Sequence, residues 1–155
     1  MVKKYTNAEV LDFLRKNPVM NLSFIGDRKP HATVLLFHVT DDFTFYFGAK
    51  EISYKGRALI QNPGVSLSVW QHKQMLVQAD GFVSRVIDEN VDDVLTKITS
   101  SIPMIKDFWP PILRTKGDDY VAFEIKLTWL RVLDLTNPSI NEEESPFTEF
   151  KLVDK

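Results

Sequence analysis

The sequence predicts a mainly β fold in which six strands, mostly antiparallel, close into a small barrel flanked by two or three helices. Apolar and alternating segments recur at regular spacing and are joined by short polar turns, which is typical of such barrels. The chain has 155 residues, the length of one domain, and 44% of them are hydrophobic. A chain of this size can bury a core without disulfide or metal staples.

The start of the chain predicts a helix over about 7–16. Thr6 and Glu9 have the spacing of a capping box, in which each side chain accepts the backbone N–H group of the other residue. The apolar residues that follow share one helical stripe. Asn17-Pro18 ends the helix, because the residue before a proline avoids the helical region.

Three strands should follow as a meander. Residues 19–26 alternate apolar and polar side chains, the period of a strand with one face in water. Residues 31–40 are β-branched and nearly all apolar, which favours a central strand that is covered on both faces. Two aspartates turn the chain, and residues 43–48 form the third strand.

The middle of the chain predicts a second helix and two more strands. Ser53 can cap a helix that runs to about Gln61, where an Asn-Pro-Gly sequence ends it. Residues 65–70 alternate again, and residues 75–88 form a longer strand. Gly81 lies inside this strand, and an interior glycine suggests a bulge or a close approach by another group.

The C-terminal third predicts one more helix and one long strand. Apolar residues at helical spacing indicate an amphipathic helix from Glu89 to about Ser101. Residues 120–135 form the last strand. We expect residues 1–155 to form a single domain in which 136–155, with its acidic cluster, is a loose C-terminal tail.

Composition and charge exclude several classes of protein and bear on the cellular compartment. Without cysteine the chain has no disulfide or thiolate, and it suits a reducing compartment, so a cytoplasmic location is expected. A net charge of −2 argues against a non-specific nucleic-acid binder, which needs a basic face to displace counterions. No apolar run is long enough to span a membrane, and the charged start is not a secretory signal.

No metal site is expected. His31 and His38 are seven residues apart on one predicted strand, so their side chains face opposite sides and cannot share a metal. His72 falls in a loop, and three unconnected histidines are the simplest interpretation.

A short polar segment, Ser53-Tyr54-Lys55-Gly56-Arg57, opens the second helix and is the strongest candidate for a ligand site. A helix N-terminus offers free N–H groups and the positive end of the helix dipole, so it attracts anions. Ser53 adds a hydroxyl, Lys55 a full charge, and Arg57 a planar fork suited to phosphate oxygens. These groups suit a phosphomonoester. The alternative is a solvated first turn whose cations bind nothing, although cations there oppose the dipole.

Residues 19–86 resemble the pyridoxamine 5′-phosphate oxidase-like, FMN-binding split-barrel proteins. VLLF (34–37) resembles the strand whose backbone lies along the flavin, and FYF (45–47) is similar to the family's Phe-Tyr-Thr. SYK (53–55) resembles its Ser-Arg-Lys, in which the lysine binds the FMN phosphate. NPGVSLSVW (62–70) resembles Asn-Pro-x-Val-Ser-Leu-x-Phe-x-Trp, and Gly81 falls where the next strand carries a glycine.

The resemblance implies a six-stranded antiparallel split β-barrel with FMN as its cofactor. The polar segment would hold the phosphate, and the isoalloxazine would lie over residues 32–35, near Phe47. Because the flavin of this family sits between two subunits, the resemblance also implies a homodimer. The cofactor-binding residues that it implies are Ala32, Thr33, Val34, Leu35, Phe47, Gly48, Ser53, Tyr54, Lys55 and Arg57.

The sequence departs from the family pattern at the phosphate site. Pyridoxamine phosphate oxidases proper have an arginine where Ala32 stands, so one phosphate contact would be lost. Arg57 and Lys50 are the candidates to replace it. Tyr54 stands in place of the arginine of Ser-Arg-Lys.

Further departures concern the flavin ring and the substrate. A flavin-contacting glutamine aligns with Leu76, and Gln74 and Gln78 are candidates to replace it. No counterpart of the C-terminal Arg-Leu-His-Asp-Arg segment that grips the pyridoxal substrate is present, so vitamin B6 oxidation is not expected. Trp109 and Trp129 could cover the flavin ring or pack as ordinary core aromatics, and the same interpretation holds for Phe37, Phe43 and Phe45, for which core packing is favoured.

The function that the resemblance implies is an FMN-dependent oxidoreductase that transfers hydride or electrons between a nicotinamide or other donor and a small molecule. The flavin carries such chemistry itself, so no side chain is assigned as catalytic. Two alternatives stay open. One is a flavin-binding or stress-related protein without a defined turnover, and the other is a binder of deazaflavin or haem on the same scaffold.

Overall fold

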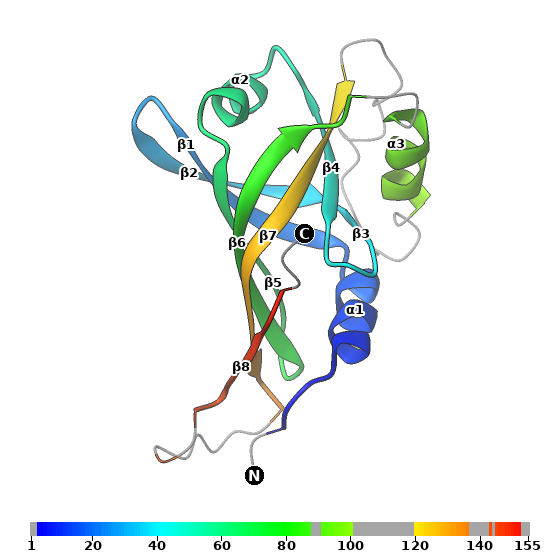
Figure 1. Cartoon of the computed structure of the whole chain (residues 1–155), viewed down its shortest axis with the longest axis vertical. Coiled ribbons are helices and arrows are strands. Elements are labelled where there is room, and N and C mark those ends of the chain that lie inside the picture. The colour runs from blue at the N-terminus through cyan, green and yellow to red at the C-terminus, as the bar shows by residue number, and fades with distance from the viewer. Residues whose placement is uncertain (1–2, 88–90, 101–119, 137–142, 144, 153–155) are drawn as a thin grey trace.

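The structure is a computed structural model that describes residues 3–87, 91–100, 120–136, 143 and 145–152 (Figure 1). It is a curled antiparallel sheet with three helices around it, and β8 joins the sheet beside β7. The order of the remaining strands is β2-β1-β5-β6-β7-β4-β3. The elements are α1 (Asn7–Lys16), β1 (Val19–Gly26), β2 (Lys29–Leu36), β3 (His38–Val39), β4 (Phe45–Lys50), α2 (Tyr54–Gln61), β5 (Gly64–Gln71), β6 (Met75–Arg85), α3 (Val91–Ser100), β7 (Tyr120–Asp134) and β8 (Phe147–Phe150).

The two ends of the sheet are consecutive pieces of one chain segment. β2 pairs with β1, and β3 pairs with β4. Between them the N–H group of Phe37 bonds to the carbonyl of Pro18 at 2.9 Å instead of to a strand partner. The segment predicted as one strand over 31–40 therefore divides at Phe37 and joins both ends of the sheet. The other five predicted strands are confirmed, and β8 is a further strand that was not predicted. The expected split β-barrel is confirmed.

Side chains that point into the barrel form the core. Phe45 and Phe47 of β4 are fully buried, and the Phe47 ring stacks on Phe123 of β7 with centroids 5.4 Å apart. The ring centroids of Phe37 and Phe45 lie 4.9 Å apart. Phe43 is also buried, so the interpretation of Phe37, Phe43 and Phe45 as core residues is confirmed.

Local signals placed the starts of α1 and α2 correctly. Thr6 and Glu9 form the capping box of α1, with the Glu9 N–H group 3.2 Å from the Thr6 hydroxyl. The bulge expected at Gly81 is also present, as a register shift between Asp80 and Gly81 where β6 pairs with β7. A Cβ at Gly81 would lie 2.5 Å from the Lys126 carbonyl oxygen, so the two backbones approach more closely than a side chain allows.

The expectation of a loose tail over 136–155 is corrected in one stretch. Phe147–Phe150 forms β8, which pairs with β7 from Leu130 to Leu133. The guanidinium of Arg131 lies 4.0 Å from the Phe147 ring centroid and 5.0 Å from that of Trp129. The contact with Phe147 adds a cation–π attraction between β7 and β8. No helix among the described residues is long and apolar enough to cross a membrane.

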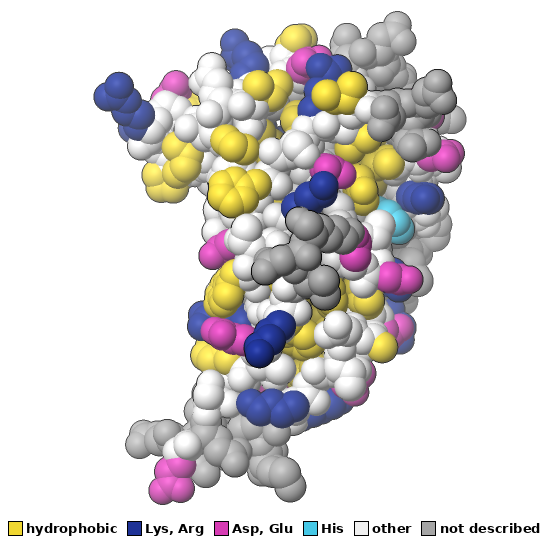
Figure 2. All heavy atoms as spheres, in the orientation of Figure 1, with side chains coloured by type: hydrophobic (Ala, Val, Ile, Leu, Met, Phe, Trp, Pro, Cys, Tyr) yellow, Lys and Arg dark blue, Asp and Glu magenta, His cyan; other side chains and the backbone are white. Residues whose placement is uncertain are grey.

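Apolar side chains also lie on the outside of the barrel. Figure 2 shows hydrophobic side chains gathered on the face that carries β1, β2 and β6. Val34 of β2 and Phe82 of β6 are 57% and 58% exposed, and Ile25 of β1 is 38% exposed. Small polar side chains separate them, since Asn21 and Ser68 pair across β1 and β5. We call this surface the outer face and define it by Ile25, Val34 and Phe82. Its apolar side chains lie on β1, β2 and β6.

Candidate functional site

The polar segment that opens α2 folds as a capped helix start. The Ser53 hydroxyl accepts the N–H group of Gly56 at 3.0 Å and donates to the Lys50 carbonyl at 2.6 Å. A Cβ at Gly56 would lie 2.3 Å from that same carbonyl oxygen, so only glycine lets the first turn press against the end of β4. The predicted cap is confirmed. Because the single Ser53 proton is already donated, the hydroxyl is committed to the helix start.

Lys55 is a half-buried cation without a counter-charge. No described residue offers its ammonium group a hydrogen bond or an ion pair. Burial lowers the pKa of Lys55, because the charged form loses hydration. The N–H groups of Tyr54 and Lys55 lie in the first turn, where a helix supplies no partner. A desolvated cation in the same helical turn as free N–H donors fits an anion such as a phosphate.

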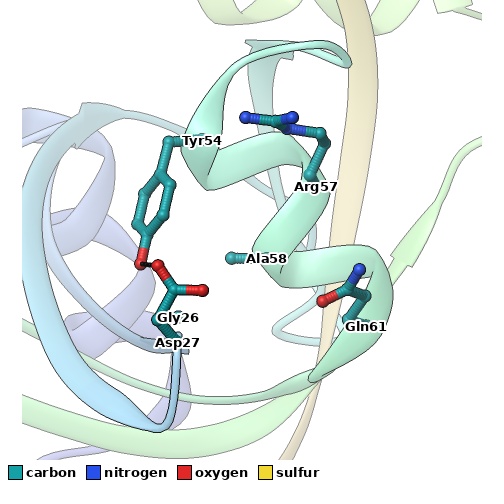
Figure 3. A pocket seen from close by; sticks show the side chains of 6 residues that line it. All are labelled: Gly26, Asp27, Tyr54, Arg57, Ala58 and Gln61. Atoms are coloured by element: carbon teal, nitrogen blue, oxygen red, sulfur yellow. Dashed lines mark hydrogen bonds between the residues drawn. The ribbon is translucent and has the colours of Figure 1, made fainter.

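The two cations of the segment do not converge. Lys55 and Arg57 are two positions apart, which places them roughly 200° apart around the helix. Arg57 instead shares a face of α2 with Tyr54, Ala58 and Gln61, and these residues line a cavity of about 310 Å³ (Figure 3). Of the two candidates to replace the missing arginine, Arg57 thus lies on another face of the helix from Lys55.

Tyr54 joins α2 to the turn between β1 and β2. Its hydroxyl donates to Asp27 Oδ2 at 3.1 Å (Figure 3). The same hydroxyl lies 3.2 Å from His31 Nε2. His31 Nε2 also lies 3.1 Å from the Gly26 carbonyl oxygen, and the His31 ring stacks on Phe24. Burial and the hydrogen bond to Asp27 raise the pKa of Tyr54. The phenol is therefore neutral and anchored at neutral pH.

Sequence reasoning missed this anchor. His31 was interpreted as one of three unconnected histidines, and Asp27 was assigned no role. They lie 23 and 27 positions from Tyr54, so no local spacing relates them. Only the packing of the β1–β2 hairpin against α2 brings the three side chains together.

The predicted flavin-binding strand, residues 32–35, forms part of β2. Ala32 and Val34 point outward, Thr33 is half-buried, and Leu35 lies in the core. Among the described strands β2 pairs only with β1, so one edge of its backbone is open. Among the described residues, this edge beside an exposed face has backbone donors and acceptors without a strand partner. His31 adjoins this strand, and through Tyr54 it connects the strand to the start of α2.

Phe47 and Gly48 are placed differently from the other predicted site residues. The Phe47 side chain is fully buried in the barrel, so only its backbone could contact a ligand outside. Gly48 faces outward beneath α3, where a Cβ would lie 3.0 Å from Leu95 Cδ2. A flavin that lies over residues 32–35 near Phe47, as predicted, could therefore reach only the backbone of Phe47, because β-strand alternation turns its ring into the core.

The structure also gives the positions of the residues that could replace the missing flavin-contacting glutamine and of one tryptophan that could cover the flavin ring. Gln78 accepts a hydrogen bond from Arg131 Nε at 2.9 Å, whereas Gln74 is exposed in a turn. Trp129 is half-buried beside Arg131. Trp109 lies outside the described residues.

The curled antiparallel sheet, joined at its ends through β2 and β3 and carrying α2 at its rim, defines a split-barrel protein. Residues 6–134 match the model of the Pyridoxamine 5'-phosphate oxidase family, so the chain belongs to this family. The family resemblance drawn from the sequence is thereby confirmed.

One curated relative is a pyridoxine/pyridoxamine 5'-phosphate oxidase of Haemophilus ducreyi. It is 25% identical over 92 residues, which cover 59% of this chain and 44% of that protein. The match thus spans less than half the length of this relative.

Solved structures share the fold. A conserved hypothetical protein of Mycobacterium tuberculosis has a TM-score of 0.73 and 21% identity, over 90% of this chain and 93% of that chain. General Stress Protein 26 of Bacillus anthracis has a TM-score of 0.65 and 19% identity, over 83% and 93%. A heme storage protein of Vibrio cholerae has a TM-score of 0.62 and 16% identity, over 79% and 91%. At these identities the likeness shows the fold alone.

Proposed function

We propose that this protein binds FMN at the junction of β2 and α2 and acts as an oxidoreductase on a small molecule. The observation that carries the proposal is Lys55, a half-buried cation at a helix start for which no described residue supplies a counter-charge. Holding such a cation out of water is unfavourable unless an anion joins it. Membership of a family that includes pyridoxamine phosphate oxidases supports a phosphate-bearing flavin as that anion.

The chain contributes binding and orientation. The Lys55 ammonium group and the free N–H groups of the first turn would hold the phosphate, with Ser53 fixing the turn. The open backbone edge of Ala32, Thr33, Val34 and Leu35 would contact the flavin. Bound FMN would supply the capacity to accept and donate a hydride or electrons. The protein would orient the ligand and exclude water around it.

We propose that the outer face is covered by a second copy of the chain. Val34 and Phe82 are each more than half exposed, and Val34 belongs to the proposed flavin strand. A homodimer that packs on this face would bury these side chains and place the flavin between subunits. Exposed apolar groups rimmed by polar ones are typical of such interfaces.

We propose for this chain a substrate other than that of the Haemophilus relative. That protein is named for oxidation of pyridoxine and pyridoxamine 5'-phosphate. Within residues 129–155 the sequence shows no Arg-Leu-His-Asp-Arg segment of the kind that grips the pyridoxal substrate, and this supports the proposal of another small molecule.

Identification of the released chromophore tests the proposal. The purified protein is denatured, and the supernatant is analysed by absorbance and mass spectrometry. FMN, present in about one copy per chain, is expected. A colourless protein that also fails to quench the fluorescence of added FMN would contradict the proposal.

Two further readings of the same sample separate the alternative functions. Bleaching of the flavin bands by NADH or NADPH without oxygen indicates an oxidoreductase, and bands that persist with every donor indicate a passive flavin binder. Haem binding is a second candidate, because a heme storage protein shares this fold. A Soret band in place of flavin bands would favour it.

A further inference from the structure

We propose that Tyr54 is a positioning residue. Its hydroxyl bonds the first turn of α2 to the β1–β2 turn, a connection called here the lock, and thereby holds Lys55 where a phosphate can bind. The proposal rests on the proposed function and adds to it a residue that binds no ligand itself. Tyr54 replaces an arginine of the family pattern, so its role cannot be that of a phosphate ligand carried over from that arginine.

The hydrogen bonds of Tyr54 form the connection between two elements. Its hydroxyl donates to Asp27 Oδ2 at 3.1 Å and lies 3.2 Å from His31 Nε2. Within the described part of the chain, no other side-chain hydrogen bond joins α2 to the β1–β2 hairpin. The phenol ring also meets His31 edge-on, with centroids 5.3 Å apart.

The β1–β2 turn is shaped to receive the phenol. Asp27 and Arg28 have φ angles of 50° and 61°, so the chain reverses tightly and presents the Asp27 carboxylate to α2. A Cβ at Gly26 would lie 2.5 Å from the Tyr54 hydroxyl oxygen and 2.9 Å from the ring. Glycine at this position therefore leaves room for the Tyr54 side chain.

The lock would act through Lys55 because the two residues are neighbours in a short helix. α2 has eight residues, and its first turn is otherwise held by the Ser53 cap. The half-buried Lys55 ammonium group gains hydration whenever this turn frays, so burial favours the frayed state. The Tyr54 hydrogen bonds oppose fraying. Tyr54 lies roughly 100° from Lys55 around the helix, and its proton is committed to Asp27, so it is not itself a phosphate donor.

A double-mutant cycle tests the lock in the full chain. The dissociation constants of FMN and riboflavin are measured by fluorescence quenching for the wild type, Tyr54→Phe, Lys55→Met and the double variant. Tyr54→Phe keeps the ring and removes both hydrogen bonds. It is expected to weaken FMN about three- to tenfold and to leave riboflavin unchanged. The double variant should bind FMN no more weakly than Lys55→Met, because Tyr54 acts only through Lys55.

Gly26→Ala provides a second variant that leaves α2 untouched. Its Cβ would displace the phenol, so it should weaken FMN to the same extent as Tyr54→Phe. Thermal unfolding of each variant confirms that it is folded.

The outcomes distinguish the lock from the proposed function. If Lys55→Met weakens FMN while Tyr54→Phe and Gly26→Ala do not, the lock is overturned and the phosphate site stands. Additive losses in the double variant, or equal losses for FMN and riboflavin with Tyr54→Phe, also overturn it. If the wild type binds no FMN, the proposed function fails and the lock fails with it.

Discussion

Asp134 is a buried carboxylate at the end of β7, and three hydrogen bonds stabilise its charged form. Tyr5 donates its hydroxyl proton to Asp134 Oδ1 at 3.0 Å, and Thr136 donates from its N–H group at 2.9 Å and its hydroxyl at 2.6 Å. Burial alone would raise the pKa of Asp134, but the hydrogen bonds from Thr136 and Tyr5 lower it. Burial and the same contact raise the pKa of Tyr5 to about 12.

The lowered pKa of Asp134 predicts an acid-dependent contribution to stability. The unfolded chain binds the proton more readily, so the contribution is complete above the unfolded pKa of about 3.9 and is lost as pH falls through the folded pKa. Asp134→Asn should lower the free energy of unfolding by about 1.5–3 kcal/mol at pH 7, and by less near pH 3. Urea unfolding at both pH values measures this. An equal loss at the two pH values would show that the charge of Asp134 does not matter.

At the residue scale, contacts between residues close in the sequence were predictable, whereas contacts between residues far apart in the sequence were not. The cap at Ser53 and the capping box at Thr6 follow from spacings of three residues, and both are present. The contact of Tyr54 with Asp27 and His31 depends on how a hairpin packs against a helix. That packing is set by the whole barrel, and no local pattern encodes it.

At the scale of elements, β5 and β6 carry two glycines with different roles. A Cβ at Gly81 would lie 2.5 Å from a backbone oxygen of β7, whereas the nearest atom to a Cβ at Gly64 would be a side-chain carbon of Phe82 at 3.9 Å. The first distance is impossible without movement of the strand, and the second is an ordinary contact. The bulge thus depends on Gly81, whereas Gly64 has room for a methyl group.

This difference gives a matched pair of variants. Gly81→Ala should lower the free energy of unfolding by about 1–3 kcal/mol, because the backbones of β6 and β7 must separate. Gly64→Ala should change it little. Thermal and urea unfolding of both variants measures this, and equal effects would contradict the assignment of the bulge.

Strand boundaries show where sequence patterns stop being informative. β8 has four residues, too few for an alternating pattern to stand out beside an acidic cluster. The division between β2 and β3 at Phe37 was also not predictable, because residues 31–40 are nearly all apolar and carry no turn residue. Both features depend on which strand is the neighbour, and this is decided by the closure of the barrel.

At the scale of the whole molecule, the outer face connects assembly to the cofactor. Val34 belongs to the proposed flavin strand and is 57% exposed in the single chain. The strand over residues 31–40 was predicted to be covered on both faces. In the single chain the core covers one face of β2, and the face that carries Val34 is exposed. The proposed second copy of the chain would supply the other cover.

Val34→Glu tests this assembly. A carboxylate buried in the interface without a partner should weaken dimerisation at least about tenfold, and FMN binding should weaken with it. Ile87→Glu is a control at a side chain that is 80% exposed beyond the end of β6. Sedimentation equilibrium and FMN titration measure both effects. A Val34→Glu variant that dimerises and binds FMN like the wild type would refute the proposed interface.

The most direct test of the central claim is the ratio of riboflavin to FMN dissociation constants in the wild type and in Lys55→Met. Riboflavin lacks only the phosphate, so the ratio isolates the phosphate contact. Loss of a charged hydrogen bond should weaken FMN about ten- to a hundredfold and leave riboflavin unchanged. Lys16→Met, at an exposed lysine of α1, should change neither constant. An unchanged ratio in Lys55→Met would contradict the account.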